Sequence, residues 1–161
     1  MRKSKATPQA SPLEANLQVG TTLRTKIKQG LTALLPIDRE RIAKDSRSEF
    51  LDSLNLDDAL LTTHPQEHRW DYLVSYNPRG IVIGIEVHTA STSQVSTIIS
   101  KKDAAIRQLQ PHSKPSARIN EWIWISSGAV KIHQLDRARI RLAQNGIKLV
   151  GSELAIKHLQ P

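Results

Sequence analysis

The chain has 161 residues, of which 39% are hydrophobic and 24% are charged, and its formal net charge is +8. These proportions are ordinary for a globular protein, and the length suits one domain better than two. No apolar run approaches the ~20 residues that a membrane-spanning helix requires, so we expect no membrane partner. The absence of cysteine excludes disulfides, thiolate chemistry and zinc–thiolate sites, and it fits a cytoplasmic protein.

The excess of basic residues favours a polyanionic partner, and nucleic acid first, because neutralising phosphates releases bound counterions. Residues 1–18 are polar, contain Pro8 and Pro12 and lack apolar periodicity, so they are predicted to form a flexible basic arm. Residues 19–161 are predicted to form a single domain.

Two helices are predicted before the first strand. Apolar residues recur at helical spacing from Thr22 to Pro36, where the proline ends the pattern. A second helix is predicted from Asp38, whose side chain can cap it, to Leu54, because an apolar stripe runs along this segment. Residues 59–66 are predicted to be a loop.

The next segment predicts a β-hairpin. Residues 70–76 and 81–88 are rich in β-branched and aromatic side chains, and residues 77–80 between them have the composition of a tight turn. A hairpin that closes symmetrically at this turn places Asp71 directly opposite Glu86.

Helices and strands alternate in the rest of the chain. A helix is expected within residues 89–109 and a strand at residues 121–125. A second helix at residues 135–145 precedes a strand at residues 147–150, and a closing helix is expected at residues 152–159. The predicted fold class is α/β, with a small mixed central sheet of about four strands flanked by helices.

The pair formed by Asp71 and Glu86 is the most informative feature of the hairpin. Side chains directly opposite each other on an antiparallel face have Cβ atoms only about 5 Å apart. Like charges this close repel, and a divalent cation such as Mg²⁺ or Mn²⁺ removes the repulsion, since hard cations take carboxylate oxygens. His88 extends the same face by alternation, whereas Trp70 and Tyr72 are predicted on the opposite, apolar face.

This arrangement resembles the PD-(D/E)xK, or restriction-endonuclease-like, nuclease superfamily, whose pattern is an Asp on one strand and Glu-x-Lys near the end of the next. Asp71 and Glu86-Val87-His88 carry the resemblance, and the order of elements over roughly residues 41–150 adds to it. The resemblance implies a restriction-endonuclease-like core in which Asp71 and Glu86 bind Mg²⁺, with the Val87 carbonyl as a further ligand. It also implies a magnesium-dependent phosphodiesterase or endonuclease.

The sequence departs from the family pattern at two positions. Trp70 precedes Asp71 where the name-giving motif has Pro, and His88 stands in the position of the motif Lys. His88 itself could accept a proton from water or ligate the metal, since histidine titrates near neutral pH. Alternatively, the cation comes from the following helix, where Lys102 falls in the middle of the apolar stripe and Lys101 on its flank. The predicted catalytic residues are therefore Asp71, Glu86, His88 and Lys102.

Contacts with nucleic acid are predicted at Lys101 and at Arg137 and Arg141, which share one helix face at i, i+4 spacing. A solvated basic face is the simpler interpretation of the two arginines. The leading hypothesis is a nuclease-like protein that acts on phosphodiester bonds, of DNA in preference to RNA. The alternatives are a catalytically inactive nuclease-fold subunit that binds nucleic acid or scaffolds a larger complex, and a protein-interaction module. The sequence is compatible with a homodimer or with a subunit of a larger complex.

Overall fold

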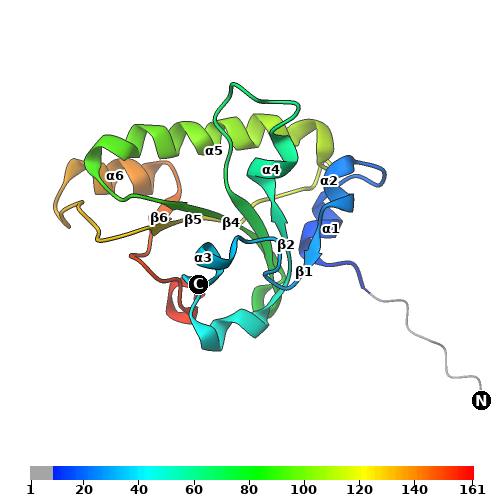
Figure 1. The fold of residues 1–161 in the computed structure, drawn as a ribbon, viewed down its shortest axis with the longest axis horizontal. Helices are drawn as coiled ribbons and strands as arrows, with labels where there is room; N and C mark the ends of the chain where they lie inside the picture. The colour runs from blue at the N-terminus through cyan, green and yellow to red at the C-terminus, as the bar shows by residue number, and fades with distance from the viewer. Residues whose placement is uncertain (1–8) are drawn as a thin grey trace, which may run out of the picture.

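A six-stranded sheet forms the centre of the protein in a computed structural model that describes residues 9–161 (Figure 1). The strands lie in the order β1-β2-β3-β4-β5-β6. The pairs from β1 to β4 are antiparallel, whereas β4–β5 and β5–β6 are parallel. The predicted mixed α/β architecture is confirmed, but the sheet has more strands than the four expected.

The elements have the following bounds. The strands are β1 (Lys28–Gln29), β2 (Phe50–Asn55), β3 (Tyr72–Tyr76), β4 (Ile81–His88), β5 (Glu121–Ser126) and β6 (Ile147–Leu149). The α-helices are α1 (Pro12–Asn16), α2 (Thr22–Thr25), α3 (Pro36–Arg39), α4 (Leu56–Leu60), α5 (Val95–Leu109) and α6 (Arg137–Gln144). Short 3₁₀ turns are η1 (Lys44–Glu49), η2 (Asn77–Arg79), η3 (Thr92–Gln94), η4 (Gln110–His112) and η5 (Ile156–Leu159). Over the part of the chain that the structure describes, none of these helices has both the length and the apolar character needed to cross a bilayer.

The hairpin of β3 and β4 has the predicted register. Tyr72 pairs with Ile85 and Tyr76 with Ile81, which is the symmetric closure about residues 78 and 79. Gly80 closes the turn at φ +60°, a left-handed conformation that glycine adopts without steric cost. The helix that follows, the strand after it and the helix–strand pair beyond are also confirmed as α5, β5, α6 and β6.

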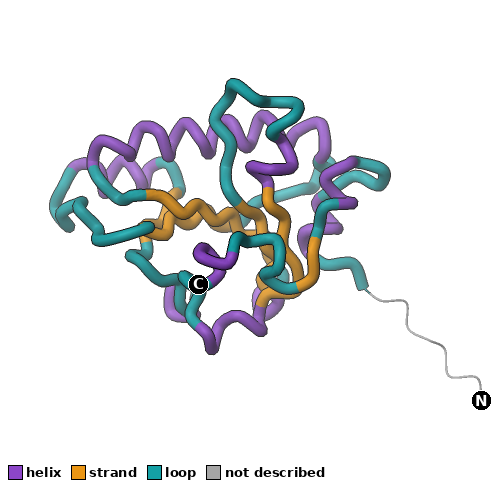
Figure 2. The backbone as a smooth tube through the Cα atoms, viewed as in Figure 1, coloured by secondary structure: helices purple, strands orange, loops and turns teal. Residues whose placement is uncertain are grey.

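Each face of the sheet has its own apolar cluster. The longest helix, α5, covers one face together with α1 and α6 (Figure 1), while loops and short helices cover much of the other (Figure 2). Trp70 was predicted on the face of Tyr72, but it packs under α5 edge to face with Trp122, with ring centroids 5.0 Å apart. Trp70 lies before the first paired residue of β3, so strand alternation does not extend to it.

The N-terminal half of the chain differs most from the prediction. The helix expected from Thr22 to Pro36 ends at Thr25, and the chain then enters β1, which pairs Lys28 with Ser53. The helix expected up to Leu54 is replaced by α3, η1 and strand β2. The closing helix at residues 152–159 is reduced to the 3₁₀ turn η5.

The predicted flexible arm is wrong from about Ser11 onwards. Residues 12–16 form helix α1, and Leu13 and Leu17 are buried in the cluster under α5. The amide of Leu13 donates a hydrogen bond of 3.0 Å to Ser75 Oγ on β3. The first eight residues of the predicted arm lie outside the described residues.

Gly84, in the middle of β4, allows the two tryptophan rings to approach the sheet. A Cβ built at Gly84 would lie 2.8 Å from Cε3 of Trp122 and 3.1 Å from Nε1 of Trp70. We therefore expect Gly84→Ala to lower the free energy of unfolding by about 1–3 kcal/mol, the usual cost of overpacking. Gly128→Ala is the control, because a Cβ there meets nothing within 4 Å. Urea denaturation checks both variants, and equal losses would contradict this packing.

Candidate active site

Asp71 and Glu86 meet at the end of the sheet where β4 stops. Asp71 immediately precedes β3, and Glu86 is the third residue from the end of β4. The Asp71 amide donates to Glu86 Oε2 at 3.1 Å, and the Val87 amide donates to Asp71 Oδ2 at 3.0 Å. The structure thus brings the two predicted carboxylates together and ties each to the backbone of the neighbouring strand.

Lys101 of α5 completes this group. Its ammonium is hydrogen-bonded to the Glu86 carboxylate and lies 3.4 Å from Asp71 Oδ1. The Glu86 side chain is completely buried, while those of Asp71 and Lys101 keep a minor exposed fraction. We call Asp71, Glu86 and Lys101 the carboxylate–lysine cluster. The sequence predicts Lys101 as a contact for nucleic acid, and its contact with the two carboxylates was not predicted.

Burial and mutual repulsion dominate the electrostatics of the cluster. Burial, and then the neighbouring Asp71 charge, raise the pKa of Glu86 to about 8. Burial also raises the pKa of Asp71, although Lys101 opposes this effect. Burial disfavours the charge on Lys101, but the two carboxylates outweigh it and raise the pKa of the ammonium. The single positive charge of Lys101 therefore faces two acids, and Glu86 keeps its proton to a higher pH than an ordinary glutamate does.

Lys102 does not join the cluster. Its ammonium is hydrogen-bonded to the Asn145 carbonyl at the end of α6, and it lies 5.6 Å from the centroid of the Trp122 ring. Burial lowers the pKa of Lys102. The helix after the hairpin does supply a lysine to the carboxylates, but this lysine is Lys101. The prediction of Lys102 for this position is wrong.

His88 is engaged at the end of β4. Its Nε2 and Gln94 Oε1 are 2.8 Å apart, and its carbonyl accepts a hydrogen bond of 3.0 Å from Trp124 Nε1. In residues 9–161 no hydrogen bond or ion pair joins His88 to either carboxylate of the cluster. The contacts of His88 connect β4 with the start of α5 and with β5.

The two predicted arginines lie on α6. Arg137 and Arg141 are both exposed, and the guanidinium of Arg141 donates to Ser96 Oγ of α5 at 3.3 Å. Asp136 caps the first turn by accepting a hydrogen bond of 2.8 Å from the Ala138 amide. The role of Arg137 and Arg141 in nucleic-acid contact stays a prediction.

The oxygen donors at the cluster suit Mg²⁺ or Mn²⁺ better than a softer metal such as zinc or copper. No group of three or more His, Cys, Asp or Glu side chains that could hold a metal occurs within residues 9–161. Mg²⁺, however, is commonly bound through one or two carboxylates, with water and substrate oxygens completing its shell. Asp71 and Glu86 meet this lower requirement, and the Val87 carbonyl stays a predicted further ligand.

The raised pKa of Glu86 makes the stability of the protein depend on pH. The folded state binds this proton up to about pH 8, whereas the unfolded side chain loses it near its ordinary pKa of 4.5. Stability from Glu86 is therefore lost as pH rises through this window, by at most about 1.4 kcal/mol per pH unit. We expect Glu86→Gln to remove this part of the slope, as measured by urea denaturation at several pH values between 5 and 8.

Glu121→Gln is the matched control for the pH experiment. Although burial opposes the effect, Arg79 and Lys148 lower the pKa of Glu121, so its titration falls below the measured window. The dependence of the free energy of unfolding on pH between 5 and 8 should therefore be the same in Glu121→Gln as in the unsubstituted protein. A Glu86→Gln variant with an unchanged slope would show that Glu86 is ionised throughout this range.

Comparison with protein-family models, curated proteins and solved structures found no match for this chain.

Proposed function

We propose that this protein is a metal-dependent nuclease-like enzyme of restriction-endonuclease-like fold that hydrolyses phosphodiester bonds in nucleic acid. The observation that carries this proposal is the contact of the Lys101 ammonium with both Asp71 and Glu86. Two acids and a lysine are the three groups of the nuclease pattern, and here α5 supplies the lysine that the strand lacks at His88.

Each group of the cluster has a distinct task in this proposal. Asp71 and Glu86 would hold Mg²⁺ or Mn²⁺, which when bound supplies positive charge for the phosphate oxygens. Lys101 has three donors on its ammonium and would stabilise the negative charge that develops on the phosphate. The burial of Glu86 strengthens these interactions, because charges interact more strongly away from bulk water.

Nucleic acid is the favoured substrate because of the charge of the chain. The formal net charge of +8 supports binding to phosphates, and DNA is proposed in preference to RNA. Arg137 and Arg141 are exposed on α6, which packs against α5, the helix that carries Lys101. We propose that they contact the phosphate backbone.

Cleavage assays test the enzymatic proposal. Single- and double-stranded DNA and RNA are incubated with the purified protein and Mg²⁺ or Mn²⁺, and Glu86→Ala is compared with the unsubstituted chain. We expect metal-dependent cleavage that Glu86→Ala abolishes and that Glu153→Ala, at an exposed position, leaves intact. If the unsubstituted protein degrades none of these substrates with either metal, the enzymatic proposal fails.

A catalytically inactive nucleic-acid-binding subunit is the second candidate. The observation that favours it is that the Lys101 ammonium bonds to both carboxylates, the groups that would have to bind a metal. This candidate predicts binding that needs no metal, survives Glu86→Ala and weakens steeply with salt. A protein-interaction module, by contrast, would bind its partner with little dependence on salt.

A further inference from the structure

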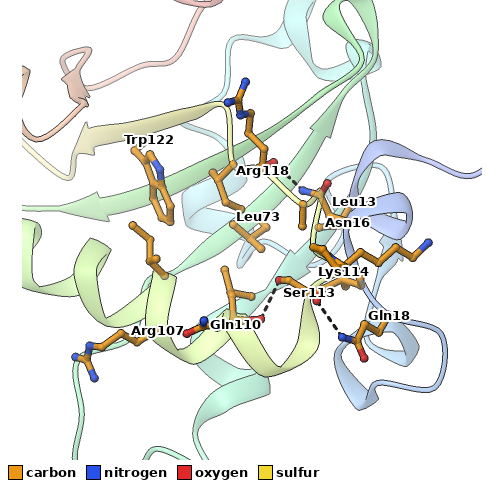
Figure 3. A pocket seen from close by; sticks show the side chains of 16 residues that line it. Leu13, Asn16, Gln18, Leu73, Arg107, Gln110, Ser113, Lys114, Arg118 and Trp122 are labelled. Atoms are coloured by element: carbon orange, nitrogen blue, oxygen red, sulfur yellow. Dashed lines mark hydrogen bonds between the residues drawn. The ribbon is translucent and has the colours of Figure 1, made fainter.

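A cavity of about 660 Å³ lies between the last turns of α5, helix α1 and the loop that leads into β5 (Figure 3). Leu73 of β3 and Trp122, the second residue of β5, lie at its floor. This is the end of the sheet where β5 begins, whereas the carboxylate–lysine cluster lies where β4 ends. No residue of that cluster lines the cavity, so it is a separate site.

The walls of the cavity are mainly aliphatic. The apolar side chains that line it include Leu13, Leu17, Leu73, Ile106, Leu109 and Trp122. Ile106 is 52% exposed, although it belongs to a helix that otherwise buries most of its large apolar residues. A hydrocarbon chain in the cavity would cover Ile106, and burial of this apolar surface would favour binding.

Every charged residue that lines the cavity is basic: Arg107, Lys114 and Arg118. Figure 3 shows their charged ends on different sides of the cavity, at its edge and directed away from Leu73. Arg107 lies 3.7 Å from Glu67, but Lys114 and Arg118 form no ion pair with any residue between 9 and 161. The apolar interior is therefore bordered by two cations without an acidic partner in that range.

Hydrogen bonds hold the two sides of the cavity together. Asn16 Nδ2 donates to the Arg118 carbonyl at 2.7 Å, and Gln18 Nε2 donates to the Ser113 carbonyl at 3.0 Å (Figure 3). The Lys114 amide donates to the Asn16 carbonyl at 2.8 Å. The segment that contains α1 is thus fixed to the loop before β5, and the cavity is formed before any ligand arrives.

The aromatic ring in the floor is not available for base stacking. Trp122 contacts Trp70 edge to face, and the Lys102 ammonium lies over the Trp122 ring. Trp122 is itself buried. A nucleobase would therefore find aliphatic walls and no free aromatic face, whereas a flexible hydrocarbon chain needs neither stacking nor hydrogen bonds.

From these features we infer that the cavity binds a small amphipathic anion with a single hydrocarbon chain, such as a medium-chain carboxylate. The chain would lie over Leu73 between Leu13 and Ile106, and the carboxylate would lie at the mouth near Lys114 and Arg118. The volume falls within the ~300–1,000 Å³ range of small-molecule sites. This inference is independent of the proposed nuclease activity.

Isothermal titration of the full chain with decanoate tests the inference, with 1-decanol as the uncharged ligand of equal chain length. We expect saturable binding of decanoate and at least tenfold weaker binding of the alcohol. Ile106→Glu should weaken decanoate binding at least tenfold, because it places a like charge on the wall. Ile140→Glu is the control, since Ile140 is 58% exposed on α6 and does not line the cavity.

Charge reversal at the mouth gives a second, independent test. The double variant Lys114→Glu/Arg118→Glu should bind decanoate at least tenfold more weakly. Lys131→Glu/Lys157→Glu makes the same change in charge at exposed positions outside the cavity and should bind it normally. Thermal melts establish that all variants are folded. The inference is overturned if decanoate fails to saturate the protein, if control variants lose affinity equally, or if a single-stranded oligonucleotide displaces decanoate competitively.

Discussion

Lys101→Met is expected to reduce phosphodiester cleavage by about 100- to 1,000-fold, the usual loss when a group that stabilises transition-state charge is removed. Methionine keeps much of the length of the side chain but has no charge and no donor. Lys102→Met is the matched control on the same helix, because its ammonium contacts the Asn145 carbonyl rather than the acids. The measurement is the single-turnover cleavage rate with saturating Mg²⁺, and full activity of Lys101→Met would rule out the proposed role.

Metal affinity gives a readout of Lys101 that does not depend on turnover. In the structure the ammonium bonds to the carboxylates of both Asp71 and Glu86, the oxygens proposed to hold the metal. A bound cation and the ammonium therefore compete for the same oxygens. We expect Lys101→Met to bind Mn²⁺ more tightly than the unsubstituted protein, as measured by titration calorimetry, even though it cleaves more slowly. Weaker Mn²⁺ binding by Lys101→Met would show that the lysine supports the metal site rather than competing with it.

The mistaken choice between the two lysines has a simple geometric origin. The predicted stripe of the helix used its large apolar residues, including Ile99 and Ile106, and this stripe is centred on Lys102. In the structure Ile106 is exposed, while Ala104, Ala105 and Gln108 are buried. On a wheel of about 100° per residue, these residues move the centre of the buried arc away from Lys102 to a point near Ala105, which is closer to Lys101. Counting the two alanines as apolar would still leave the stripe centred near Lys102, because Ile99 and Ile106 lie on that side of the helix. The correct choice depends on Ile106 being exposed and Gln108 buried, which the apolar pattern does not indicate.

The hairpin was predictable because its information is local. The turn, its glycine and the alternation of side chains lie within one short stretch. They fix the pairing of Tyr72 with Ile85, and this pairing brings Asp71 next to Glu86. Strand β2 was not predictable in this way, because its register shifts between Phe50 and Ser53. This irregularity puts Phe50 and Leu54 into different apolar clusters and removes the period of two from the sequence.

The edge strand β1 shows the same limit of local patterns. Lys28 and Gln29 are exposed, and they pair with β2, which lies more than twenty residues further along the chain. Helical spacing around them predicted one long helix, but tertiary pairing overrides such local preferences. The interface of α1 with β3 escaped prediction for a similar reason, since two leucines in a polar segment give no periodic signal.

Trp124→Ala is expected to lower the free energy of unfolding by about 3–5 kcal/mol, the range for truncation of a buried tryptophan. Trp124 is fully buried in the middle of β5 and pairs in parallel register with Glu86. Its indole N–H donates to the His88 carbonyl, which also accepts from the Ser127 amide, so the substitution removes one of these two hydrogen bonds at the end of β4. For a domain of this size the melting temperature should fall by about 10 °C or more, as measured by circular dichroism.

Two comparison variants separate packing from the hydrogen bond of Trp124. Trp124→Phe keeps most of the apolar volume but loses the donor to the His88 carbonyl, so about 1–2 kcal/mol of the effect should remain. Leu135→Ala should leave the melting temperature unchanged, because Leu135 is 87% exposed. Glu86 of β4 pairs with Trp124 of β5. If the His88 end of β4 positions the Glu86 carboxylate, Trp124→Phe should also weaken Mn²⁺ binding. Unchanged Mn²⁺ affinity in a folded Trp124→Phe variant would assign that positioning to Lys101 and to the backbone amide of Asp71 instead.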